Sequence, residues 1–314
     1  MTVRNEHHLA SERWELERIV AELRVSRGKR PRNGKDARVP FQMPSREALH
    51  KIIDGLFAAL FPTHFGWADL SEEGVDYFVG HTLDATLHLL QEQVVREFRS
   101  AATQDSQDRT ALEHRAFELT RSFAGQLPKI RALLETDIHA AYQGDPAAKS
   151  IEEVRFCYPG ITGITYHRIA HELHQLGTPL LARIVAEIAH SATGIDIHPG
   201  AQIGGSFFID HGTGVVIGET AIIGVRVRLY QAVTLGAKRF PVGENGVLVK
   251  GAPRHPIVED DVVIYSGATI LGRVTIGRGS TIGGNVWITR DVPPGSHVTQ
   301  ALARSEAYDD GGGI

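Results

Sequence analysis

Branched aliphatic residues recur at every sixth position through much of the C-terminal part of the chain. The longest unbroken run comprises Val258, Ile264, Ile270, Ile276, Ile282 and Ile288. A period of six fits neither the repeat of an α-helix nor the alternation of an ordinary β-strand, but it is typical of a parallel β-helix. In that fold, three six-residue units close one triangular coil of about 18 residues. We therefore expect side chains one coil apart, such as those of Ile264 and Ile282, to stack in a continuous core.

Two interruptions of this period indicate where a functional site is built. An earlier aliphatic series follows the same spacing at Ile197, Ile203, Ile209 and Val215, and then at Ile217, Ile223, Leu229 and Leu235. The series shifts by two residues between Val215 and Ile217, and the period is lost across residues 236–256. His211 and His255 lie close to these interruptions. We expect residues 236–256 to leave the coil as a loop, and loops on a rigid scaffold commonly carry functional residues.

The sequence before the repeat has the spacing of amphipathic helices. Apolar residues recur there at steps of three and four, and Pro128 is expected to kink or divide one helix. The chain is thus predicted to have an α+β fold, with a helical domain before the β-helix. The predicted parts are a flexible N-terminal extension with a basic linker (1–44), an α-helical domain (45–193), a β-helix domain (194–298) and a flexible C-terminal tail (299–314).

Composition narrows the functional classes. A net charge of -4 over 314 residues gives no general attraction to nucleic acid or to anionic membranes. The sequence has no apolar stretch long enough to span a membrane and no apolar core of a secretory signal, so we expect a cytoplasmic protein. A single cysteine, Cys157, excludes an internal disulfide framework and fits a reducing compartment. His167, His171 and His174 have helical spacing, but no fourth ligand accompanies them and no metal is expected.

Several short motifs indicate a particular protein family. The segments DIHP, IDHGTGVVIGET, QAVTLG, RHP and DVPPGS, together with a helical domain before the β-helix, closely resemble the serine acetyltransferase family. The resemblance extends from about Ser45 to the last residue. It implies a left-handed β-helix, a homotrimer or a dimer of trimers, and acetyl-CoA bound between neighbouring prisms. The implied reaction transfers acetyl from acetyl-CoA to the hydroxyl of L-serine, giving O-acetyl-L-serine in cysteine biosynthesis.

The resemblance also implies a catalytic pair. A serine hydroxyl is a poor nucleophile at neutral pH, so a base must take its proton during attack on the thioester. By resemblance His211 is this base and Asp196 orients its ring, as a carboxylate does for imidazole in other acyl transfers. The two residues are 15 positions apart, close to one coil, so we expect them to approach each other on adjacent coils.

The remaining site residues are also assigned by resemblance. Asp145 and Asp210 match positions that bind the amino group of serine, and Arg254 matches the arginine that binds its carboxylate. His255 would orient the substrate and Glu219 would support the site. Gly236 and Ala237 are the predicted contacts to acetyl-CoA.

Two features outside these motifs complete the expectations. The loop before Arg254 is longer than in the commonest bacterial members of the family, and its basic residues are Lys238, Arg239 and Lys250. The chain ends in Ile314, and by resemblance such a C-terminus enters the active site of O-acetylserine sulfhydrylase to form a cysteine synthase complex.

Alternative functions remain open at this level. Another CoA-dependent hexapeptide acyltransferase, with a sugar or homoserine as acceptor, would share the repeat. His198, His211 and His255 are compatible with a zinc enzyme of the γ carbonic anhydrase type. A mainly regulatory subunit that docks its tail into the sulfhydrylase is a further reading.

Overall fold

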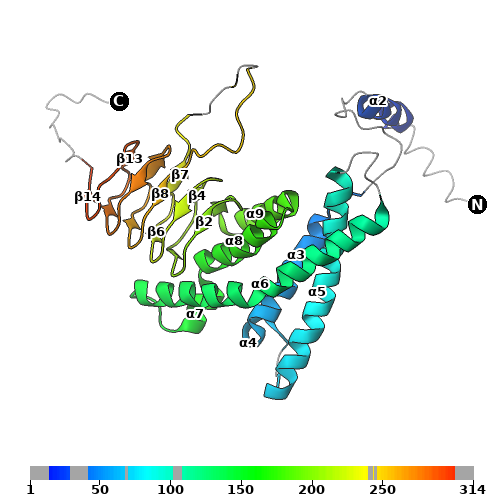
Figure 1. Ribbon diagram of the computed structural model, residues 1–314, viewed down its shortest axis with the longest axis horizontal. Coiled ribbons are helices and arrows are strands. Elements are labelled where there is room, and N and C mark those ends of the chain that lie inside the picture. The colour runs from blue at the N-terminus through cyan, green and yellow to red at the C-terminus, as the bar shows by residue number, and fades with distance from the viewer. Residues whose placement is uncertain are drawn as a thin grey trace, which may run out of the picture.

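The computed structural model describes residues 14–28, 42–67, 70–101, 108–239, 243 and 246–300, and it contains a helical region followed by a parallel β-helix (Figure 1). This order confirms the predicted α+β architecture. The helices are α2 (Leu16–Gly28), α3 (Arg46–Leu60), α4 (Pro62–Phe65), α5 (Glu72–Ala101), α6 (Arg109–Gly144), α7 (Ile151–Cys157), α8 (Pro159–Gln175) and α9 (Pro179–Thr193). None of these helices is long and apolar enough to cross a bilayer.

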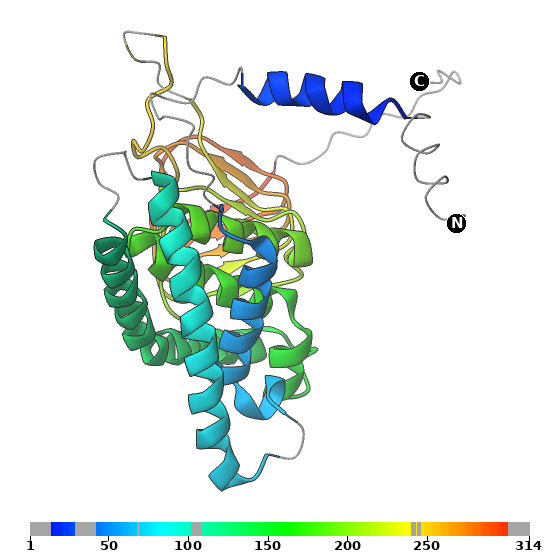
Figure 2. The same cartoon turned by 90° about the vertical axis from the view of Figure 1, so that its right-hand side faces the viewer.

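Local sequence signals explain where the helices begin. The side chain of Ser45 accepts a hydrogen bond from the backbone of Ala48 at 3.2 Å, and Ser150 caps α7 in the same way through Glu153 at 3.0 Å. Such caps satisfy backbone N–H groups that have no partner within the helix. Pro128 lies inside α6, which continues as one helix and changes direction along its length (Figure 2). The helix is therefore not divided at this proline.

Helix α2 lies within the N-terminal extension and was not predicted from the sequence. Arg18 forms ion pairs with Glu15 at 2.6 Å and with Glu22 at 2.8 Å, which are contacts between neighbouring turns of a helix. Residues 29–41, which include most of the basic linker, lie outside the described residues.

The β-helix consists of short parallel strands that form three sheets. The strands are β1 (Asp196–Ile197), β2 (Gln202–Ile203), β3 (Phe208–Ile209), β4 (Val216–Ile217), β5 (Ile222–Ile223), β6 (Arg228–Leu229), β7 (Thr234–Gly236), β8 (Ile257–Val258), β9 (Val263–Ile264), β10 (Thr269–Leu271), β11 (Thr275–Ile276), β12 (Thr281–Ile282), β13 (Trp287–Ile288) and β14 (His297–Val298). The sheets have the orders β1-β4-β7-β10-β13, β2-β5-β8-β11 and β3-β6-β9-β12-β14. Each sheet is one face of a triangular prism, and the aliphatic side chains fill its interior.

Strand pairing shows how regular each coil is. Ile264 pairs with Ile282, as predicted, so this coil contains three whole repeat units. Asp196 pairs with Val216, so the first coil is longer than the regular one by the same small shift that interrupts the period in the sequence. The coil that carries Ile222 over Ile257 is longer still, because the described parts of segment 236–256 project from the prism as a loop (Figure 1).

A buried ion pair fixes the helical region to the first coil. Arg168 on α8 donates two hydrogen bonds to Asp137 on α6, at 2.7 and 2.9 Å, and it also donates to the carbonyl of Gly204 at 2.8 Å. Asp137 in turn accepts a hydrogen bond from the backbone of Phe207 at 2.9 Å. Because both charged groups are almost fully buried and paired, removing either would leave an uncompensated charge in the interior. The ion pair therefore holds α6 and α8 against the segment that leads into β3.

Candidate active site

His211 lies at the corner between β3 and β4, where the first coil is lengthened. Its backbone has φ +60°, and Gly212 and Gly214 also have positive φ values. Other non-glycine residues at corners of the prism, such as Arg226, share this backbone conformation, so it belongs to the geometry of the coil. The His211 side chain is 69% exposed, and its Nδ1 atom lies 3.5 Å from Oδ1 of Asp210. The corner therefore presents an accessible imidazole beside a carboxylate.

Two residues of the helical region adjoin this corner. Asp145, at the end of α6, accepts hydrogen bonds from the hydroxyl of Tyr158 at 2.5 Å and from the backbone of Ala147 at 2.8 Å. The hydrogen bond from Tyr158 is the main reason that the pKa of Asp145 is lowered, and the charge of His211 adds to it. Burial and the neighbouring Asp145 raise the pKa of Tyr158 above its ordinary value. Asp145 is therefore held as a carboxylate near His211.

Sequence reasoning missed Tyr158. Its signal was its position directly before Pro159, which occupies the first turn of α8. A proline there fixes the start of a helix, so the preceding residue can be placed at a helix N-terminus. Nothing in the sequence indicates that the hydroxyl reaches Asp145.

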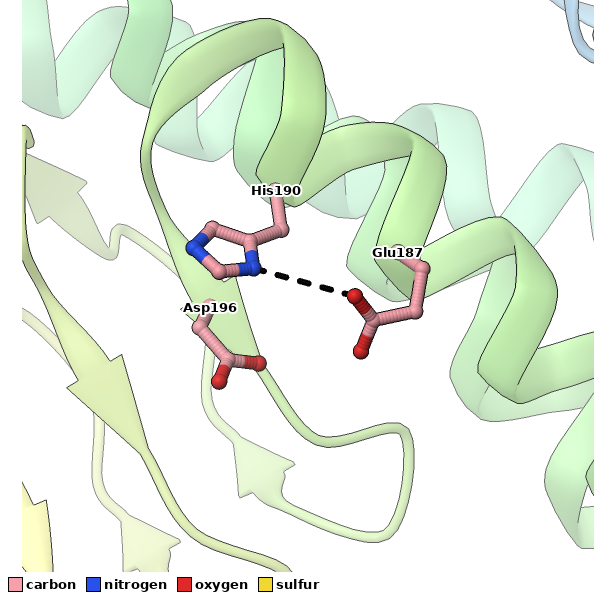
Figure 3. A group of neighbouring side chains, drawn as sticks. All are labelled: Glu187, His190 and Asp196. Atoms are coloured by element: carbon pink, nitrogen blue, oxygen red, sulfur yellow. Dashed lines mark ion pairs between the residues drawn. The ribbon is translucent and has the colours of Figure 1, made fainter.

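The side chain of Asp196 has two polar neighbours at the end of α9. No hydrogen bond or ion pair joins it to His211 among the described residues, and its carboxylate lies near Glu187 and His190 (Figure 3). The backbone of Asp196 pairs with that of Val216 across the lengthened first coil. His211 is thus five positions before the residue that lies over Asp196. In this structure Asp210 is the carboxylate recorded at His211 Nδ1.

Arg254 and His255 form a second cluster at the corner between β4 and β5. Arg254 makes a 2.6 Å ion pair with Glu219, and its backbone N–H donates to the hydroxyl of Thr220 at 2.9 Å. Nδ1 of His255 accepts a hydrogen bond from the backbone of Thr220 at 3.0 Å. The base of the long loop is thereby attached to the coil, and three predicted site residues lie together.

The electrostatics of this second cluster follow from burial and from Arg254. Burial is the main cause of the lowered pKa of His255, and the charge of Arg254 contributes. Its ring is therefore neutral near pH 7, with the proton on Nε2 because Nδ1 accepts a hydrogen bond. Burial alone would raise the pKa of Glu219, but the hydrogen bond and charge of Arg254 hold it below its usual value. Gly218 is needed beside the His255 ring, since a Cβ there would lie 2.0 Å from a ring carbon.

The two clusters occupy different corners of the prism. In the described part of the chain, no hydrogen bond or ion pair connects His211 or Asp210 with Arg254 or His255. Gly236, at the end of β7, accepts a backbone hydrogen bond from Gly272 at 2.9 Å, and Ala237 follows it at the base of the loop. Ile314 lies outside the described residues.

Metal-type donors gather at one place among the residues that the structure describes. The set is Glu187, His190 and Asp196, and it does not include the histidines singled out in the sequence. His167 and His171 have ring centroids 5.6 Å apart on α8, and the Nδ1 atom of His167 is buried without a hydrogen-bond partner.

A parallel β-helix of six-residue repeats, with an exposed histidine and carboxylates at a coil corner, defines the class of hexapeptide-repeat acyltransferases. The bacterial transferase hexapeptide family (six repeats) matches residues 255–290. A plasmid-encoded serine acetyltransferase of Synechococcus elongatus is 63% identical over 277 residues, which cover 87% of each chain. The serine acetyltransferase of Mycobacterium tuberculosis is 50% identical over 56% of this chain and 74% of its own length. The chain belongs to the serine acetyltransferase family.

Solved structures agree with this assignment. Serine acetyltransferase isoform 3 of Entamoeba histolytica, in complex with cysteine, matches with a TM-score of 0.68 and 34% identity. The match covers 92% of this chain and 93% of that one. The Neisseria gonorrhoeae enzyme in complex with serine matches with a TM-score of 0.52 and 26% identity, over 86% of this chain and all of that one. The left-handed β-helix and the acyltransferase class expected from the sequence are confirmed.

Proposed function

We propose that this chain transfers the acetyl group of acetyl-CoA to the hydroxyl of L-serine, releasing O-acetyl-L-serine and CoA. The observation that carries the proposal is the accessible imidazole of His211, held in a left-handed turn beside Asp210 and near Asp145. The 63% identical relative and several other relatives bear the name of this activity.

His211 acts as the general base of the reaction. Nε2 takes the proton of the serine hydroxyl while the hydroxyl oxygen attacks the thioester carbonyl carbon. The tetrahedral intermediate collapses with cleavage of the C–S bond, and the imidazolium returns its proton to the departing thiolate. A carboxylate at Nδ1 keeps the reactive tautomer and stabilises the imidazolium. Asp210 lies at that atom here, and Asp196 takes this role if its side chain turns from α9 toward the corner.

The substrate charges match the two clusters. Asp145 and Asp210 would bind the ammonium of L-serine, and the guanidinium of Arg254 would bind its carboxylate through paired hydrogen bonds. In the structure the Arg254 guanidinium is paired with Glu219 at 2.6 Å. This ion pair positions the guanidinium, and the substrate carboxylate would replace Glu219 as its partner. His255 offers its Nε2–H as a donor beside it.

Because the clusters lie at different corners of one prism, the complete site requires a second copy of the chain. We propose a trimer in which the Arg254 and His255 cluster of one copy faces the His211 cluster of its neighbour. Acetyl-CoA would then lie between adjacent prisms, close to Gly236 and Ala237. The assembly of two trimers, a cytoplasmic location and capture of Ile314 by O-acetylserine sulfhydrylase are further parts of the proposal.

The decisive experiment measures consumption of acetyl-CoA by the full chain with and without L-serine. We expect release of CoA only when L-serine is present. L-homoserine and glucosamine serve as competing acceptors, since they test the homoserine and sugar transferases that share the fold. Preference for either of them would contradict the proposal.

Deletion of Ile314 should abolish binding to the sulfhydrylase and leave acetyl transfer unchanged.

A further inference from the structure

The end of α9 brings three metal-type side chains together. Glu187 and His190 lie one turn apart on α9, and Asp196 begins β1 after the left-handed turn at Gly194. One donor atom of each side chain lies within 4.8 Å of the others. Figure 3 shows the Glu187 carboxylate facing the His190 ring across the marked ion pair, with the carboxylate of Asp196 below the ring. The three side chains therefore converge from two elements that the turn folds against each other.

The spacing of the donors suits a small cation. Nδ1 of His190 is 3.8 Å from Oε2 of Glu187. Donors bound tetrahedrally at about 2.0–2.2 Å from an ion lie about 3.4 Å apart, so no pair needs to close by more than about 1.4 Å. Side-chain rotation covers such a distance, because Glu187 and His190 have side chains that are 44% and 47% exposed. The exposure also leaves room for water to complete the coordination.

The local charge favours a cation. The last turn of a helix carries a partial negative charge from its free carbonyl groups, and His190 lies in that turn of α9. Arg183 neutralises part of the charge by donating to Oε1 of Glu187 at 2.7 Å, but this leaves Oε2 directed at His190. The side chain of Asp196 has no hydrogen bond or ion pair within the described ranges, so its charge is not balanced by any lysine or arginine there.

We propose that Glu187, His190 and Asp196 bind one divalent transition-metal ion. Two carboxylates and one imidazole with open positions are a donor set used by Fe²⁺, Co²⁺ and Zn²⁺, whereas Mg²⁺ and Ca²⁺ prefer oxygen donors alone. No metal was expected from the sequence, and these three residues were not singled out there as a set.

The site has a consequence that rests on the proposed function. Asp196 is the residue that the family resemblance pairs with His211, and the bound ion would hold its carboxylate at α9. The metal and the base therefore compete for one side chain. Metal binding lowers acetyl transfer by keeping Asp196 away from the imidazole.

The test uses the untagged full-length chain and Co²⁺, whose visible absorption reports its coordination. We expect one Co²⁺ per chain, with affinity at least about tenfold weaker in His190→Ala and in Glu187→Gln. His88→Ala is the matched control, because His88 is exposed on α5 and pairs at 3.4 Å with Asp84, without a third donor. Unchanged Co²⁺ affinity in both test variants, or no Co²⁺ binding by the parent, overturns the site.

A second measurement separates the site from its effect on activity. Loss of the acetyl-CoA thioester is followed with and without Co²⁺ in the parent and in His190→Ala. We expect inhibition in the parent and at least about tenfold less sensitivity in the variant. Binding without inhibition overturns the competition for Asp196. Absence of acetyl transfer in the metal-free parent contradicts the proposed function, while the Co²⁺ titration still decides the site.

Discussion

The last coils of the prism and its first coils are built from the same repeat, but they differ in regularity. Between β8 and β13, paired strands are separated by three whole repeat units in every sheet. Between β1 and β8 only the step from β4 to β7 is regular, since the first coil is lengthened at its corner and a later one by the loop. The predicted site residues of the prism lie at these irregular corners or directly beside them. The core ladder is the same in both regions, because the strands still pair in parallel register, so extra residues at a corner alter the surface without changing the interior.

The largest difference between the two regions is expected in catalysis. His211→Ala, at an irregular corner, should lower kcat by about 10²–10⁴-fold, because a general base contributes that much. Acetyl-CoA binding should change little, which equilibrium binding measures alongside steady-state rates. His297→Ala, on β14 just beyond the regular coils and away from both irregular corners, is the control and should keep full activity. An equal decrease in kcat in the two variants would show that the irregular corner has no special role in catalysis.

The regular coils should dominate stability. Ile270→Ala removes a fully buried side chain between β7 and β13 and should lower the free energy of unfolding by about 2–5 kcal/mol. Val247→Ala, on the loop, removes a side chain that is 62% exposed and should change it by less than about 0.5 kcal/mol. Denaturant titrations of both variants make the comparison. A loop variant as destabilised as the coil variant would show that the loop is part of the folded core.

Arg254 tests whether the second irregular corner binds the substrate carboxylate. Arg254→Gln loses a charge-assisted pair worth about 1.5–3 kcal/mol, so kcat/KM for L-serine should fall by about 10–100-fold. KM for acetyl-CoA should stay near its parent value, because the thioester does not use this side chain. Lys250→Gln, in the same loop, provides a matched loss of positive charge. A similar effect of both variants would indicate general electrostatics rather than a specific contact.

The smallest expected effect concerns pH. Burial lowers the pKa of His167 well below its ordinary value, with a contribution from His171. The unfolded chain binds a proton near pH 6.5 and the folded chain does not, so stability is complete above that pH and decreases as pH falls below it. One such proton contributes up to about 1.4 kcal/mol per pH unit. His167→Gln should reduce this slope in unfolding experiments between neutral and mildly acidic pH. An unchanged slope would assign the pH dependence to other groups.

Much of the fold follows from local patterns. The spacing of Ile264 and Ile282 predicts their stacking, and the interruption at 236–256 predicts a loop, because both depend only on counting residues along a repeat. The contacts of Asp196 could not be predicted in this way. They depend on the lengthened first coil and on the angle between α9 and β1, which are set by tertiary packing.

The residues assigned by resemblance differ in how far their positions in the structure could be predicted from the sequence. Arg254, His255 and Glu219 do lie together, because the loop returns to the coil next to the strand that precedes Glu219. His211 and Asp210 are sequence neighbours and share a corner. Asp145 reaches that corner from a helix, and its hydrogen bond to Tyr158 is a long-range contact that no periodicity encodes.

The buried Asp137–Arg168 pair has a consequence for the construction of the catalytic centre. Asp145 and Tyr158 come from the helical region, whereas Asp210 and His211 come from the prism. The Asp137–Arg168 ion pair holds these two regions in a fixed relative position. In the proposed mechanism, an isolated prism would retain the imidazole of His211 but lose the Asp145 carboxylate that binds the substrate ammonium. Recognition of the acceptor would then depend on how accurately the helices and the prism are aligned.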